Sequence, residues 1–120
     1  MAINKVTSAT SVLTTANADN AFDNDSAVAD TLIVDVGAFL IAQGSNADGA
    51  LLANTGAWTV TVNGSIFSQQ SAGIDLASGN AAASTITIGT DGEVGGATGI
   101  AAFSSATINN SGLIAGANFG

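Results

Sequence analysis

The sequence predicts an all-β fold: a single-stranded parallel β-helix, or β-solenoid, of about four turns of 22–26 residues with three short strands per turn. Three observations predict it. Alternating apolar pairs recur at intervals of 26, 26 and 22 residues, glycine and a second aliphatic residue follow each pair, and all fifteen glycines lie between Gly37 and Gly120. Repeats of this length are typical of solenoids, in which each turn is one structural unit.

A single turn of this kind is not expected to fold alone. The few aliphatic side chains that it buries do not offset the conformational entropy lost in ordering about 26 residues. Stacked turns share ladder hydrogen bonds and one continuous apolar interior. The repeats are therefore expected to stack on one another as a single domain.

Residues 1–30 form a leader before the repeat region of residues 31–120, and they contain no glycine. Residues 6–15 are β-branched and rich in hydroxyl groups, which predicts an extended strand. Residues 17–30 predict a turn and an acidic loop. The strand has no place among the four expected turns, so we expect it either to cap its own first turn or to add to a neighbouring copy.

The first strand of each repeat is set by an alternating pair, and the pairs are Val34 and Val36, Val60 and Val62, Ile86 and Ile88, and Ile108 with Asn110. Period-two alternation turns these pairs toward the interior, which makes Asn110 a buried amide. It also aligns Leu32 with Trp58, and we expect Trp58 to fill the core. The intervening outward places hold Ile33 and Asp35, Thr59 and Thr61, Thr85 and Thr87, and Thr107 and Asn109.

The second and third strands are placed by their glycines. Two residues beyond a glycine stand Phe39, Ile66, Val94 and Ile114, and three residues beyond another glycine stand Leu52, Leu76 and Ala102. This alignment leaves Leu40, Phe67 and Leu113 facing outward as an apolar stripe, which suggests a partner surface. A shift of register by one residue would instead turn them inward.

Composition excludes several function classes. One lysine stands against nine acids, so the cationic contacts that nucleic acid requires are missing, and we expect no nucleic-acid partner. The chain has no Cys and no His, which removes thiolate and imidazole metal sites and most nucleophile–base pairs. No segment reaches the roughly 18 apolar residues of a membrane span, so no membrane insertion is expected. The N-terminal residues lack the apolar core of a usual signal peptide.

Residues 106–116, ATINNSGLIAG, resemble the T-I-x-N-S-G-x-I-x-G turns of secreted bacterial β-solenoids, namely autotransporter passenger domains and the repeats of type I-secreted proteins. The resemblance extends over about residues 31–120. It implies a right-handed β-helix, an extracellular or cell-surface location, and a structural or adhesive role, and it carries over no catalytic residues. The chain departs from these proteins in its shortness and in lacking the calcium-binding nonapeptide.

Three other kinds of site were weighed. The leader acids could offer oxygen ligands to calcium, although a solvated loop explains them equally; they are Asp19, Asp23, Asp25 and Asp30. The carboxylate pairs that could cleave a glycan are Asp91 with Glu93 and Asp35 with Asp75, but no cation in the repeat region would hold an anionic sugar, so we expect no enzyme. The outward threonines resemble the Thr-x-Thr ladders of ice-binding solenoids, although threonine is also common on any exposed strand.

The expected function is self-assembly. A solenoid has two ends with unpaired strand edges, so copies stacked head to tail would form a filament or matrix, with the leader strand of one copy added to the next and bound calcium regulating the repulsion. The residues expected at such contacts are Val6, Val12, Leu13, Leu40, Phe67, Asn110, Leu113, Ile114 and Phe119. The alternative is a monomeric, adhesin-like binding module.

Overall fold

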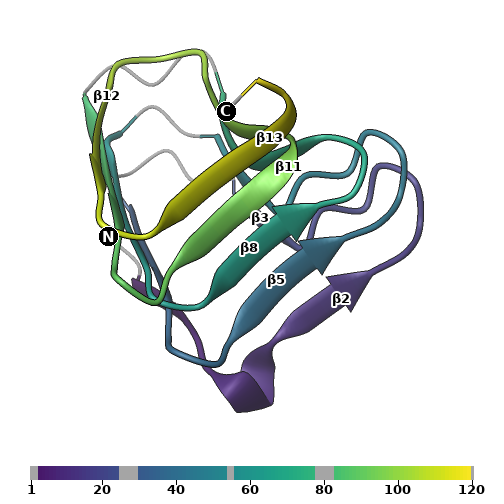
Figure 1. Ribbon diagram of the computed structural model, residues 1–120, viewed down its shortest axis with the longest axis horizontal. Helices are drawn as coiled ribbons and strands as arrows, with labels where there is room; N and C mark the ends of the chain where they lie inside the picture. The colour runs from purple at the N-terminus through teal and green to yellow at the C-terminus, as the bar shows by residue number, and fades with distance from the viewer. Residues whose placement is uncertain (1–2, 25–29, 54–55, 78–82, 120) are drawn as a thin grey trace.

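The computed structural model, which describes residues 3–24, 30–53, 56–77 and 83–119, is a parallel β-solenoid of about four turns, so the predicted fold class is confirmed (Figure 1). The first three turns hold three strands each: β1 (Ile3–Val6), β2 (Val12–Thr14) and β3 (Phe22–Asn24); β4 (Asp30–Val34), β5 (Phe39–Ala42) and β6 (Ala50–Leu52); β7 (Trp58–Val62), β8 (Ser65–Ser68) and β9 (Ala72–Leu76). The remaining strands are β10 (Ser84–Ile88), β11 (Glu93–Ala102), β12 (Ala106–Asn110) and β13 (Leu113–Phe119).

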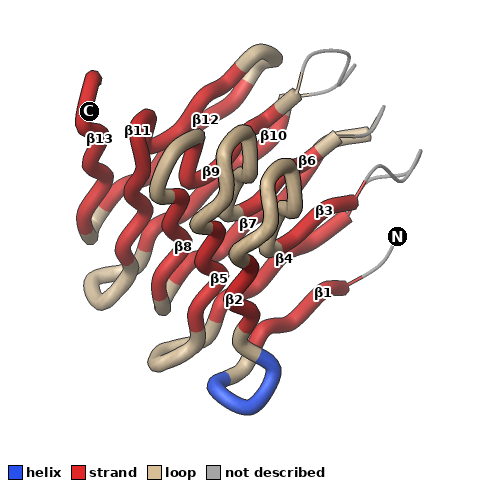
Figure 2. Tube along the Cα trace, turned by 90° about the vertical axis from the view of Figure 1, so that its right-hand side faces the viewer, coloured by secondary structure: helices blue, strands red, loops and turns tan. Residues whose placement is uncertain are grey.

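The strands form two sheets. Sheet A has the order β1-β4-β7-β10-β12 and makes the left wall in Figure 1. Sheet B has the order β2-β5-β8-β11-β9-β6-β3, with β13 also paired to β11, because the long strand β11 runs across both the second and third sides of its turn. Figure 2 shows the strands of each sheet side by side along the solenoid.

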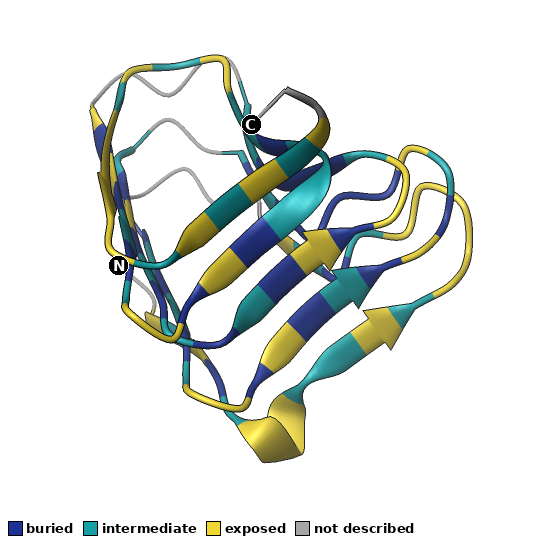
Figure 3. Cartoon of the chain, viewed as in Figure 1, coloured by how far each residue is buried: buried dark blue, intermediate teal, exposed yellow. Residues whose placement is uncertain are grey.

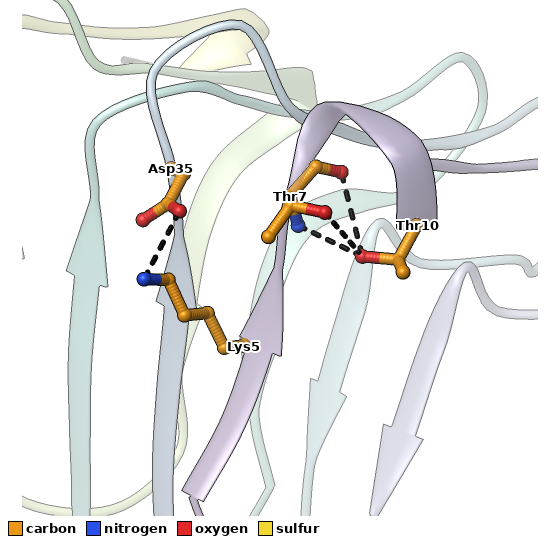
Figure 4. A network of polar contacts seen from close by, with 4 residues as sticks. All are labelled: Lys5, Thr7, Thr10 and Asp35. Carbon is orange, nitrogen blue, oxygen red and sulfur yellow. Dashed lines mark hydrogen bonds and ion pairs between the residues drawn. The ribbon is translucent and has the colours of Figure 1, made fainter.

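The leader is built into the solenoid as its first turn. β1 pairs in parallel with β4, and β2 pairs in parallel with β5, within the same chain. A 3-10 turn, η1 (Ser8–Thr10), lies between them and interrupts the single strand expected over residues 6–15. There the Thr7 amide donates to Thr10 Oγ1 at 2.8 Å, and the Thr10 amide donates to the Thr7 carbonyl at 3.0 Å (Figure 4). The leader strand is thus engaged with its own chain.

The register of sheet A corrects the alignment of the first repeat. Leu32 lies opposite Val60, and Val34 opposite Val62, so the expected pairing of Val34 with Val60 is wrong by two residues. Val36, expected inside, lies in the turn after β4 and is 66% exposed. The later repeats are as expected, with Val60, Ile86 and Ile108 in one column.

The second strand needs a correction of one residue in its first copy. Leu40, not Phe39, shares a column with Ile66 and Val94, and Leu40 is completely buried, so the outward placement of Leu40 is wrong. The shift arises because Gly37 adopts a positive φ of 78° in the turn, and Ala38 takes the place that Gly64 holds in the next turn. The third set, Leu52 with Leu76 and Ala102, is confirmed.

The interior is a continuous apolar column from Val6 to Val94 (Figure 3). Trp58 is completely buried, as expected, and its ring meets Phe22 edge to face with centroids 6.1 Å apart. At the corner before the third side, a Cβ on Gly73 would lie 2.6 Å from the Gly95 carbonyl oxygen. That glycine lets neighbouring turns approach closely enough to pair.

Candidate functional site

The two ends of the solenoid are its most distinctive surfaces. Among the described residues, β1 and β12 are the outer strands of sheet A, and each has one edge without a partner strand. In sheet B, β2 and β3 stand at the first turn and β13 at the last. Unpaired edges of this kind are templates for adding further strands.

At the C-terminal end the apolar interior is uncovered. Ile108 is 42% exposed, whereas Val60 and Ile86, which occupy the same column in earlier turns, are completely buried. Asn110 lies in the column of Val62 and Ile88 as expected, but it is exposed rather than buried. Its side-chain oxygen accepts a hydrogen bond from the Gly112 amide at 3.0 Å.

The N-terminal end is better covered. Val6 is 7% exposed, and Val12 is half-buried against the core. Asn4, in the column of Leu32, turns its amide nitrogen to the Thr31 carbonyl at 3.2 Å. This end therefore presents a mixed surface of two valines and one satisfied amide.

Charge is nearly absent from the end strands. β12 and β13 contain no charged residue, and β1 and β2 contain only Lys5. Lys5 forms an ion pair with Asp35 at 3.3 Å (Figure 4). In a chain of net charge −8, the acids are thus kept away from both ends of sheet A.

The outer face of sheet B carries an apolar groove. Its volume is about 220 Å³, and Phe67, Gly95 and Leu113 are among the residues that line it, with Ser65 and Glu93 contributing polar groups. Phe67 and Leu113 are 43% and 53% exposed, so their expected outward placement is confirmed. A Cβ on Gly95 would lie 3.2 Å from the Phe67 ring, which shows that the ring lies over the glycine. Leu13, at 54% exposure, belongs to the same outward column as Phe67.

The leader acids are not gathered into one loop. Asp30 is buried at the start of β4, opposite Trp58, instead of lying in a solvated loop. Asp23 accepts a hydrogen bond from the Asn20 amide at 3.0 Å, and Asp19 is exposed. Asp25 lies outside the described residues, within which no three acidic side chains are grouped to hold a metal ion. Calcium binding stays a prediction.

The carboxylates considered for catalysis are not paired as expected. Asp35 follows a strand of sheet A and pairs with Lys5, whereas Asp75 lies in β9 of sheet B. Asp91 and Glu93 are both exposed near the start of β11.

A carboxylate pair that the sequence did not suggest is Asp48 with Asp75. Burial, and then the negative charge of Asp48, raise the pKa of Asp75 from 3.8 to about 6. Asp48 itself is 7% exposed, and its Oδ1 accepts from the Ser71 hydroxyl at 2.6 Å and from the Ala72 amide at 3.0 Å. The 24th residue after Asp48 is the Ala72 whose amide it binds, so only the repeat period could have suggested this contact.

Comparison with known proteins gives no relative: no family model, no curated protein and no solved structure matches the chain. Among the described residues, no helix is long and apolar enough to cross a membrane. The fold and its surfaces are therefore the basis for assigning a function.

Proposed function

We propose that the protein is an extracellular structural protein that assembles head to tail, with the C-terminal end of one copy seated on the N-terminal end of the next. The observation that carries this proposal is Ile108, which continues a fully buried column yet is 42% exposed at the end of it. A second copy would bury it and would pair the free edge of β12.

The registers of the two ends support a continuous stack. Asn110 belongs to the column that starts at Val6, and Ile114 to the column that starts at Val12. A copy added in the same register would place β1 on β12 and β2 on β13. The contact is heterologous, so it does not close and would build a filament.

Edge pairing replaces strand donation as the mechanism. β1 and β2 are already paired with β4 and β5 of their own chain, so each has one remaining edge rather than being a free strand. The lack of acids in β1, β2, β12 and β13 removes local like-charge repulsion from the contact.

The test is the size of the purified protein, measured by light scattering and negative-stain electron microscopy, for wild type and for Ile108→Lys. We expect wild-type filaments and loss of elongation in the variant, because a lysine at that place would be desolvated between copies. The matched control is Val36→Lys, since Val36 is 66% exposed but lies in a side turn. A monodisperse wild type, or equal elongation by Ile108→Lys, would overturn the proposal.

A monomeric, adhesin-like binding module is the second candidate, and the groove beside Phe67 and Leu113 is what favours it. In that case the wild type would remain a single 11.5 kDa species, and Phe67→Ala would weaken a binding activity without changing the size of the particle.

A further inference from the structure

The outer face of sheet A presents an ordered array of threonines. With the register corrected, Thr31, Thr59, Thr85 and Thr107 form one unbroken column over four turns. The neighbouring outward column contains Ile33, Thr61, Thr87 and Asn109. We call these eight positions the threonine face. Asp35, which the sequence placed within it, lies beyond the end of β4.

Strand propensity alone does not explain this array. Threonine favours any half-exposed strand, so it should be found on both sheets. The outward positions of sheet B hold instead a mixture without threonine, in columns of Leu13, Ile41, Phe67, Gly95 and Ala115 and of Phe39, Ser65, Glu93 and Leu113. The threonines are therefore a property of one face.

The spacing of the face is regular in two directions. Parallel pairing places successive rungs about 4.7–4.9 Å apart, and residues i and i+2 on one strand lie roughly 6.6 Å apart. Threonine is β-branched and stiff at χ1, so each rung presents a methyl and a hydroxyl in a restricted orientation. Both repeats are close to the distances between oxygen atoms on the faces of hexagonal ice.

The hydroxyls are free to bind water, and the face is uncharged. None of the six threonine hydroxyls has a hydrogen-bond partner within the described part of the protein. From β4 to β12 the eight positions include no charged residue, although the chain carries a net charge of −8. Lys5, one rung further, is held by Asp35.

We propose that the threonine face binds ice, with its hydroxyls and methyls ordering a layer of water that matches the crystal surface. An uncharged, rigid, periodic face complements an uncharged periodic lattice, whereas a folded protein partner would need no such repeat. The proposal stands independently of head-to-tail assembly. Stacking along the solenoid axis would extend the same columns and strengthen binding by multivalency.

The experiment measures thermal hysteresis and inhibition of ice recrystallisation by the purified full chain. We expect wild-type activity and its near-complete loss in Thr85→Lys, because Thr85 is exposed at the centre of the face and a lysine there would hold the ice surface away. The matched control is Thr90→Lys, which makes the same change at an exposed residue of the turn between β10 and β11. Circular dichroism of both variants checks that the fold is kept.

A wild type without thermal hysteresis and without recrystallisation inhibition would overturn the proposal. So would equal activity of Thr85→Lys and wild type in the folded state. Particle size, measured on the same samples, separates this result from the fate of the filament: a monomer that binds ice refutes assembly only, and a filament that does not bind ice refutes the threonine face only.

Discussion

Single residues of the interior column determine whether the chain folds. Val60 is completely buried between Leu32 and Ile86, whereas the next outward position, Thr59, is exposed. Val60→Asp would bury an unpaired carboxylate, which is expected to cost more than about 4 kcal/mol and to abolish folding.

The neighbouring variant Thr59→Asp provides the control, because it introduces the same charge on the same strand but in solvent. Circular dichroism and urea unfolding should show a folded Thr59→Asp and an unfolded Val60→Asp. A cooperative unfolding transition in Val60→Asp would contradict the inward assignment of this column.

The Asp75 carboxyl makes stability depend on pH. Its pKa is raised in the folded protein from 3.8 to about 6, so between these values the folded state holds a proton that the unfolded state has released. The free energy of unfolding should therefore fall as the pH rises from about 4 to about 6, by on the order of 1 kcal/mol once solvent screening is allowed for.

Urea unfolding at pH 4 and pH 7 measures this effect in wild type, Asp75→Asn and the control Asp91→Asn. The amide cannot ionise, so Asp75→Asn should lose the pH-dependent component that wild type and Asp91→Asn share. An unchanged dependence in Asp75→Asn would place its origin in other carboxyl groups.

At the scale of strands, the sequence predicted the later repeats better than the first. A slip of two residues keeps every side chain on its face, so the pair Leu32 and Val34 could not be told from Val34 and Val36 by alternation alone. The longer corner over residues 43–49 shifted the spacing, with equivalent positions Ile3, Thr31, Thr59, Thr85 and Thr107 separated by 28, 28, 26 and 22 residues. The open end at Ile108 followed from the repeat count, whereas the full threonine column needed the corrected register.

The first turn escaped notice because its sequence departs from the repeat. Asn4 occupies the place of an aliphatic residue, and no glycine marks the corners. Its role nonetheless leads to a prediction about the elements β1 and β2. Deleting residues 1–15 would uncover the completely buried Leu32, Val34 and Leu40.

We therefore expect the deletion variant to be less stable and to aggregate irregularly, instead of remaining as soluble subunits that fail to elongate. Thermal unfolding followed by circular dichroism, with size-exclusion chromatography, distinguishes the two results. A variant of wild-type stability that stays monomeric would mean that the first turn is dispensable to the fold and acts only in assembly.

On the scale of the whole molecule, the net charge of −8 opposes association even though the end strands are nearly uncharged. Salt screens repulsion between exposed charges over a Debye length of about 30 Å at 0.01 M and about 8 Å at 0.15 M. Filament growth should accordingly be slow at low ionic strength and faster at physiological ionic strength, as followed by light scattering. Calcium, magnesium and sodium chlorides compared at equal ionic strength separate screening from a specific site: similar growth in all three indicates screening alone, while an excess with calcium that disappears in Asp19→Asn with Asp23→Asn assigns an ion to the first turn. Growth that does not respond to salt would mean that the acids lie too far from the contact to affect it.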